Sequence, residues 1–199
     1  MPRKKRICMP ELTYHVMSRC IDKRSLMKTN KMKDLMMSVI TMAQDKYIFE
    51  LVAFTIMDNH FHFCIRTCMG GEDISRIMQF IKSQYARRYN RIMNRSGPFW
   101  NERFYDTIIE DSEYPRDVFI KVNLYLGYNP VKSGYVKDPR DYKYSSFNCY
   151  WDQNYKPSIK IILHPFFLSL GETFKECAQK FLEYEESFRK RIIEELAFL

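Results

Sequence analysis

The spacing of hydrophobic positions changes several times along the chain, and each spacing predicts one element. Apolar and polar residues alternate over 13–19, which indicates a strand, and apolar residues recur every three or four positions over 32–46, which predicts a helix. A β-branched and aromatic run over 47–57 predicts a second strand. A turn-like pair at 58–59 then leads into a third strand over 60–66, so the last two strands should form a β-hairpin.

The middle of the chain carries the longest helical pattern outside the C-terminus. A break with two glycines over 68–73 separates it from the hairpin, and Asp73 or Ser75 is placed to cap the helix that follows. Apolar residues then mark one face of a helix over 74–95. A loop leads from it to a short strand over 107–110.

The last third of the chain predicts two more helices. Pro115 suits the first turn of a helix that we expect to run to about Tyr128. Because Pro130 disfavours helical backbone in the residue before it, this helix should end at Asn129. An irregular stretch follows, and the chain closes with an amphipathic helix of mixed charge over 172–195, expected to serve packing or oligomerisation.

The order of these elements, β-α-β-β-α-β-α, predicts the α+β class. The simplest arrangement is a ferredoxin-like (RRM-like) antiparallel sheet with helices packed on one face, plus a C-terminal helical extension. A chain of 199 residues fits one domain, or one domain with a modest appendage. We divide it into a domain of residues 1–150 and an extension of residues 151–199.

The excess of basic over acidic residues indicates which kinds of partner the protein could bind. The formal net charge is +8, which makes a polyanion the first candidate. The excess is strongest in PRKKR (2–6), a segment suited to contacts with a nucleic-acid backbone, and in the helix over 74–95, which has no acidic residue. The basic side chains of that helix are Arg76, Lys82, Arg87, Arg88, Arg91 and Arg95. Such a helix suits phosphate contacts, although a solvated basic face would have the same composition.

Cysteine use and hydropathy indicate the cellular setting. The six cysteines lack regular spacing, and no apolar stretch is long enough to span a bilayer. The basic N-terminus has no apolar segment typical of a signal peptide. We therefore expect a cytoplasmic protein with reduced thiols and no membrane partner.

Two histidines lie one residue apart in the otherwise apolar stretch MDNHFHFCI (57–65). Side chains alternate along a strand, so His60 and His62 share one face while Phe61 and Phe63 share the other. The aromatic face is expected in the core. Two neighbouring imidazoles on the opposite face can chelate one divalent cation. Two alternatives remain open, surface histidines without a ligand or a zinc site that includes Cys64 and Cys68.

A second motif lies sixty-odd residues downstream. Tyr125 and Asn129 are four residues apart, so they share one helical face near the end of the helix that begins at Pro115. Tyrosine is common in this chain, with 14 copies, so a purely structural role is the alternative for any one of them.

These segments resemble one family when they are taken together and in order. They are similar to sequence blocks of the HUH single-tyrosine transposases, in particular REP-associated tyrosine transposases and the transposases of small insertion sequences. The likeness covers roughly residues 12–150, and Asp58 stands where a proline is common in the family. The segments are YHVMSR (14–19), MDNHFHFCI (57–65), GPFWNERFYD (97–106), YLGYNPVKSGYV (125–136) and DYKYSSF (141–147).

The resemblance implies a metal-dependent reaction on DNA. His60, His62 and Asn129 would hold Mg²⁺ or Mn²⁺, and Tyr125 would attack single-stranded DNA near a hairpin or repeat end. This endonuclease and strand-transfer activity would pass through a 5′-phosphotyrosine within residues 1–150. Apart from the resemblance, Arg103 is expected, together with Phe99 and Trp100, to line the path of the strand.

Several points stay open at this stage. The resemblance is compatible with a monomer or a homodimer. A protein of the same fold that binds hairpin DNA without cutting it is the alternative function. An RNA-binding ferredoxin-like domain ranks last, because the aromatic strand signature of such domains is missing.

Overall fold

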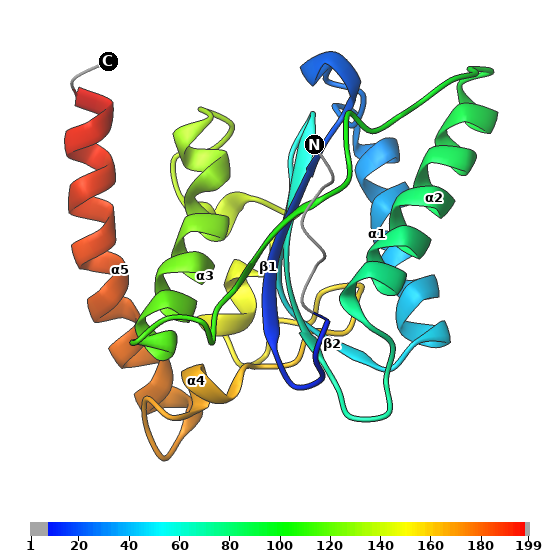
Figure 1. Cartoon of the computed structure of the whole chain (residues 1–199). Coiled ribbons are helices and arrows are strands. Elements are labelled where there is room, and N and C mark those ends of the chain that lie inside the picture. The colour runs from blue at the N-terminus through cyan, green and yellow to red at the C-terminus, as the bar shows by residue number, and fades with distance from the viewer. Residues whose placement is uncertain (1–7, 198–199) are drawn as a thin grey trace.

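A four-stranded antiparallel sheet forms the centre of the molecule (Figure 1). The computed structural model describes residues 8–197, with side chains through residue 192, so the basic segment 2–6 lies outside the described residues. The strand order is β2-β3-β1-β4, and each neighbouring pair is antiparallel. This order confirms the ferredoxin-like arrangement. The strands are β1 (Thr13–Arg19), β2 (Phe49–Ile56), β3 (His60–Thr67) and β4 (Tyr105–Ile108).

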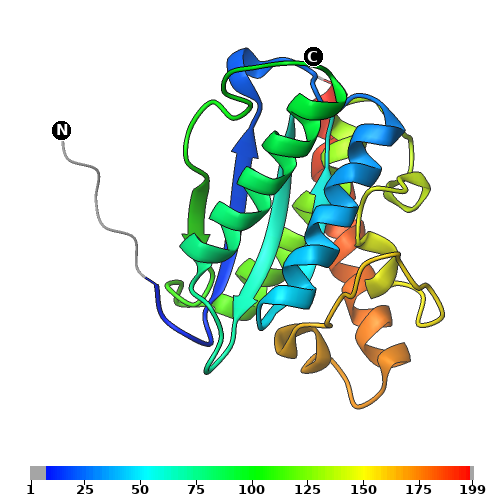
Figure 2. The same cartoon turned by 90° about the vertical axis from the view of Figure 1, so that its right-hand side faces the viewer.

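Two long helices, α1 (Asn30–Lys46) and α2 (Ile74–Ile92), cover one face of this sheet (Figure 2). Of the two residues expected as the cap of α2, Asp73 is the one observed, since its side chain accepts a hydrogen bond from the Arg76 amide. The expected aromatic face is also confirmed. Phe61 and Phe63 stack with their ring centroids 4.2 Å apart and are fully buried, which contributes about 2–3 kcal/mol for each ring.

The opposite face of the sheet is covered as well, which corrects the expectation of helices on one face only. Figure 1 shows α3 and α5 on the side of the sheet away from α1 and α2. The helices on this side are α3 (Pro115–Lys132), α4 (Pro165–Leu168) and α5 (Phe174–Ala197). Short 3₁₀ turns connect the elements at Ile21–Lys23, Pro139–Asp141 and Phe147–Tyr150. The sheet therefore lies between two apolar cores.

The end of α3 differs from the sequence expectation. The helix continues through Pro130 to Lys132 instead of stopping at Asn129. Proline lacks the amide hydrogen that would bond to the carbonyl of Leu126, four residues earlier. The buried hydroxyl of Thr55 donates to that carbonyl at 2.6 Å and replaces the missing donor. A partner from β2, which no local pattern reveals, thus lets the helix run past its proline.

The C-terminal extension packs against the rest of the chain. Phe181 of α5 shares the second core with Phe147 and Tyr150. The Tyr128 hydroxyl of α3 donates to the buried Glu185 carboxylate of α5 at 2.8 Å. The packing role expected of this helix is confirmed, while the division at residue 150 stays a prediction. Within residues 8–197, no helix combines the length and apolar character needed to cross a bilayer.

Candidate active site

The face of β3 that carries the histidines is directed toward α3. His62 is 5% exposed, and its neighbour on this face, Cys64, belongs to the core that α3 completes. The histidines are therefore neither in the aromatic core nor on an open surface. They lie between the sheet and the helix that carries the second motif.

The helix α3 brings Tyr125 to the two histidines. The ring centroids of Tyr125 and His62 are 5.4 Å apart, and those of His60 and His62 are 5.1 Å apart. One turn further along α3, the Asn129 side chain interacts with His60. Tyr125 is 37% exposed, whereas Asn129 is 8% exposed. The four side chains expected to form the site thus lie together, with the phenol at its open side.

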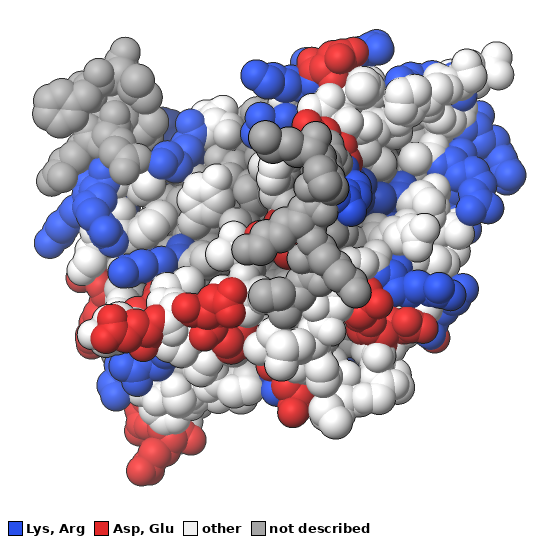
Figure 3. All heavy atoms as spheres, viewed as in Figure 1, with Lys and Arg blue, Asp and Glu red and all other residues white. Residues whose placement is uncertain are grey.

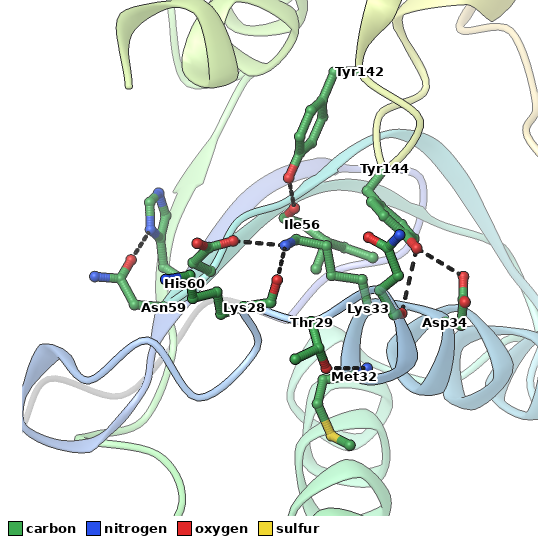
Figure 4. Close-up of polar contacts among 12 residues, drawn as sticks. Lys28, Thr29, Met32, Lys33, Asp34, Ile56, Asn59, His60, Tyr142 and Tyr144 are labelled. Atoms are coloured by element: carbon green, nitrogen blue, oxygen red, sulfur yellow. Dashed lines mark hydrogen bonds and ion pairs between the residues drawn. The ribbon is translucent and has the colours of Figure 1, made fainter. Parts of the chain in front are cut away.

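The turn before β3 orients His60 (Figure 4). The Asn59 side-chain oxygen lies 2.6 Å from His60 Nδ1, so this nitrogen donates a hydrogen bond to it. The Asn59 amide nitrogen in turn donates to the Lys23 carbonyl at 3.1 Å. Because a neutral imidazole carries one ring hydrogen, His60 Nε2 keeps its lone pair.

An ion pair holds this turn against α1. The Lys33 ammonium lies 2.6 Å from the Asp58 carboxylate, and both side chains are largely buried. The same ammonium donates to the Lys28 carbonyl at 3.1 Å, as Figure 4 shows. Removing one partner of such a pair leaves a buried charge without compensation, so each residue depends on the other. Asp58 therefore anchors the turn at the position where the family commonly has a proline.

His15 is a member of this cluster that the sequence interpretation did not single out. Its Nε2 lies 3.0 Å from His62 Nδ1, and its ring centroid lies 6.2 Å from that of Tyr125. The available signal was alternation along β1, whose residue 15 pairs with Cys64 on the same face. Nothing in one strand alone reveals that its histidine meets the pair on another.

Burial keeps the three imidazoles neutral near pH 7. It lowers the pKa of His15 to about 4, and burial together with the charge of Arg19 lowers the pKa of His60 to about 4. Burial, followed by the neighbouring histidines, lowers the pKa of His62 well below 6.5. Neutral imidazole is the form that binds a metal ion.

Most basic side chains named from the sequence lie at the surface of α2 and of the segment after it. Figure 3 shows Lys and Arg side chains over the side of the molecule formed by α2. The exposed ones are Arg76, Arg87, Arg88, Arg91 and Arg103. Lys82 points inward and Arg95 is half-buried beside the loop that follows α2, which the charge pattern did not predict. Lys82 is 9% exposed and donates to the Glu102 carbonyl, and Arg95 donates to the Pro98 carbonyl.

An open cavity of about 630 Å³ lies beside these basic residues. Its wall combines Ala86 and the Trp100 ring with Arg76 and Arg103, and the acidic residues Asp73 and Glu102 also line it. The Trp100 indole nitrogen donates to the Lys82 carbonyl at 2.9 Å, which fixes the ring at the edge of the cavity. Apolar rings beside cationic groups form a surface that suits unpaired bases and their phosphates.

In the described residues, no three His, Cys, Asp or Glu side chains gather in a way that could hold an ion. The expected ligand set of two imidazoles and one amide is of a different kind. Cys64 of the zinc alternative is fully buried, and burial raises the pKa of its thiol. Its protonated thiol is a poor ligand compared with the thiolate.

The fold and the site together define a ferredoxin-like domain with an H-x-H pair beside a helical tyrosine. The chain belongs to the family described as Transposase IS200 like, whose sequence pattern matches residues 8–118. His60 and His62 lie within the matched residues. Tyr125 and Asn129 lie beyond them, so their roles rest on the geometry above and stay predictions.

Curated relatives agree with this assignment. The chain is 30% identical over 128 residues to a REP-associated tyrosine transposase of Escherichia coli K12, covering 64% of this chain and 71% of that protein. It is also 30% identical over 113 residues to a Haemophilus influenzae protein described as "Putative REP-associated tyrosine transposase". That match covers 52% of this chain and 62% of the relative, which is less than two thirds of the relative's length.

A solved structure shares the fold. The REP-associated tyrosine transposase bound to a REP hairpin superposes with a TM-score of 0.63 and 20% sequence identity. The superposition covers 81% of this chain and 95% of that one. It supports the α+β, ferredoxin-like class assigned from the sequence.

Proposed function

We propose that this chain is a metal-dependent DNA endonuclease and strand transferase that uses Tyr125 as its nucleophile. The observation that carries the proposal is the position of the Tyr125 ring, 5.4 Å from His62, with Asn129 beside His60. Membership of the transposase family supports a reaction on DNA. The hairpin bound by the structural relative supports hairpin-containing single strands as the substrate.

The resident ion would be Mg²⁺ or Mn²⁺, as the family resemblance implies, with phosphate and water oxygens supplying the oxygen ligands that these ions prefer. His60 has its Nδ1 engaged by Asn59, so Nε2 is the nitrogen left to bind a metal. His62 would supply a second imidazole nitrogen, and Asn129 would supply its side-chain oxygen. Two nitrogens and one amide oxygen leave further coordination positions for a scissile phosphate. When bound, the ion would neutralise the phosphate oxygens that otherwise repel a nucleophile.

The chain's own part in the reaction is to supply and aim the phenol. Tyr125 attacks the phosphorus, a bond forms between its oxygen and the 5′ phosphate, and the bond to the 3′ oxygen breaks. The leaving 3′ oxygen takes up a proton, and the phenolic proton passes to water at the exposed side of the ring. Reversal of this step by another 3′-OH joins strands without ATP, because the phosphotyrosine retains the bond energy.

The surface of α2 supports binding of the substrate. Its exposed arginines carry no neighbouring acid on the helix, and Arg103 lies at the rim of the cavity beside Trp100. We assign phosphate contacts to this surface and stacking of an unpaired base to the Trp100 edge. Lys82 and Arg95, whose side chains donate hydrogen bonds to the protein's own carbonyl groups, contribute to the shape of this surface.

The decisive experiment looks for a covalent protein–DNA adduct. Labelled single-stranded hairpin oligonucleotides are incubated with the protein and Mg²⁺ or Mn²⁺, and the products are separated on a denaturing gel. Wild type is expected to give the adduct, while Tyr125→Phe, His60→Ala and EDTA-treated samples give none. Tyr114→Phe is the matched control, since Tyr114 is an exposed tyrosine at the other end of α3 and should leave the adduct unchanged.

Each failure has a separate meaning. An adduct that persists in Tyr125→Phe would show that another residue is the nucleophile. An adduct insensitive to His60→Ala and to EDTA would remove the metal from the proposal. Binding of hairpins by wild type without any adduct would favour the alternative, a hairpin-binding protein that does not cut DNA.

A further inference from the structure

His15 contacts the candidate site but belongs to neither of the two motifs assigned to the reaction. It lies on β1, whereas the histidine pair lies on β3 and Tyr125 lies on α3. Its ring stacks on that of His62, with centroids 5.2 Å apart and planes inclined by 28°. The edge of Tyr125 meets the same ring at 6.2 Å. One imidazole therefore touches both a candidate metal ligand and the candidate nucleophile.

We propose that His15 is a positioning residue with two effects. It determines which ring nitrogen of His62 faces the metal, and it orients the Tyr125 ring. This inference rests on the proposed function. It assigns to β1 a part in a site that the sequence motifs attribute to β3 and α3 alone.

The hydrogen bond between the two histidines carries the first part of the argument. His15 Nε2 and His62 Nδ1 are 3.0 Å apart, so one donates and the other accepts. If His62 Nδ1 donates, its Nε2 keeps a lone pair and can bind a metal ion. If His62 Nδ1 accepts, Nε2 carries the hydrogen and cannot. A His15 that accepts at Nε2 thus selects the tautomer competent for metal binding.

The neighbouring histidine follows the same logic, which supports this assignment. His60 also has its Nδ1 engaged, by the Asn59 oxygen at 2.6 Å, and an amide oxygen only accepts. Both candidate ligands therefore have a partner at Nδ1, and both would bind the ion through Nε2. Partners of this kind orient metal-binding histidines, and losing one weakens metal binding about 10- to 100-fold.

Packing carries the second part of the argument. The rings of His15 and His62 both meet Tyr125 edge-on, at 6.2 and 5.4 Å. Such contacts favour one orientation of the phenol over others. A β-branched side chain would suit the strand at least as well as histidine, so strand formation does not explain an imidazole at this position.

Two substitutions separate these roles. His15→Phe keeps an aromatic ring beside Tyr125 but has no acceptor, and His15→Gln keeps an acceptor but has no ring. Mn²⁺ affinity is measured by titration calorimetry without DNA, and the rate of adduct formation is then measured at saturating Mn²⁺. Thermal unfolding of each variant reports whether the fold is retained.

We expect His15→Phe to weaken Mn²⁺ binding about 10- to 100-fold. His15→Gln should bind Mn²⁺ within about threefold of wild type but form the adduct more slowly at saturation. Wild-type Mn²⁺ affinity in a folded His15→Phe would overturn the tautomer role. A wild-type adduct rate in His15→Gln would overturn the role toward Tyr125. If wild type itself bound no Mn²⁺, the proposed metal site would fail, and this inference would fail with it.

Discussion

Gly127 lies between Tyr125 and Asn129 on α3, where the helix packs directly against the ring of Phe147. A Cβ added to Gly127 would overlap the ring of Phe147 and lie 2.7 Å from its Cε2 atom. Phe147 is buried and has the rings of Tyr128 and Phe181 around it, so it has little room to move. The substitution Gly127→Ala therefore tests how tightly the nucleophile helix is seated.

Two effects oppose one another in this variant. Alanine is favoured over glycine within a helix by about 1 kcal/mol. Overpacking of a well-filled core costs up to about 3 kcal/mol. The net expectation is a loss of about 2 kcal/mol in the free energy of unfolding, or about 4–8 °C in Tm for a chain of this size.

The assay is urea unfolding followed by circular dichroism, with thermal unfolding alongside. The double variant Gly127→Ala/Phe147→Leu is the matched test, because a smaller side chain at 147 makes room for the methyl group. The two substitutions should therefore be less destabilising together than the sum of their separate effects. A Gly127→Ala protein as stable as wild type, or more stable, would refute the packing argument.

Three further outcomes follow from the structure. Burial lowers the pKa of His164 to about 3, so the unfolded chain binds more protons at this residue between pH 6.5 and 3, and the stability that His164 contributes should fall by up to about 1.4 kcal/mol per pH unit below pH 6.5, in addition to the losses at the three site histidines. Urea titrations at pH 7 and 4.5 check this, and a drop of the same size in His164→Gln would contradict it. Tyr128→Phe removes a 2.8 Å hydrogen bond to the buried Glu185 carboxylate and should cost about 1.5–2 kcal/mol by urea unfolding, whereas no loss would show that the bond contributes nothing. If the exposed Arg87 and Arg88 each contact a phosphate, changing both to Gln should reduce the salt dependence of binding to single-stranded DNA. The magnitude of the slope of log K, the binding constant, against log salt concentration should fall by about 1.4, and an unchanged slope would show that the strand binds elsewhere.

The local pattern was sufficient for most of the fold. Alternation placed β1 at the residues observed, and the turn at Asp58 and Asn59 was correctly located between two strands. The cap at Asp73 and the buried face of α2 also followed from residue type and spacing. These features depend on residues that are close in the sequence, so the sequence of one protein is enough to predict them.

Other features depend on partners that are distant in the sequence. The hydroxyl of Thr55 lets α3 continue through Pro130, although proline by itself predicts an earlier end. The composition of α2 suggests that all its charged side chains are exposed. The Lys82 ammonium is nevertheless buried, because it donates a hydrogen bond to the Glu102 carbonyl. In both cases a hydrogen bond made by tertiary packing outweighs the local preference.

The candidate site divides in the same way. The sequence alone determined that His60 and His62 share one face of a strand and that Tyr125 and Asn129 share one face of a helix, because both follow from the periods of strand and helix. Only the tertiary structure decided that these two faces meet, and that His15 from a third element contacts both His62 and Tyr125. The physical reason is that α3 covers the second face of the sheet, and the apolar core that holds it there combines residues from across the chain.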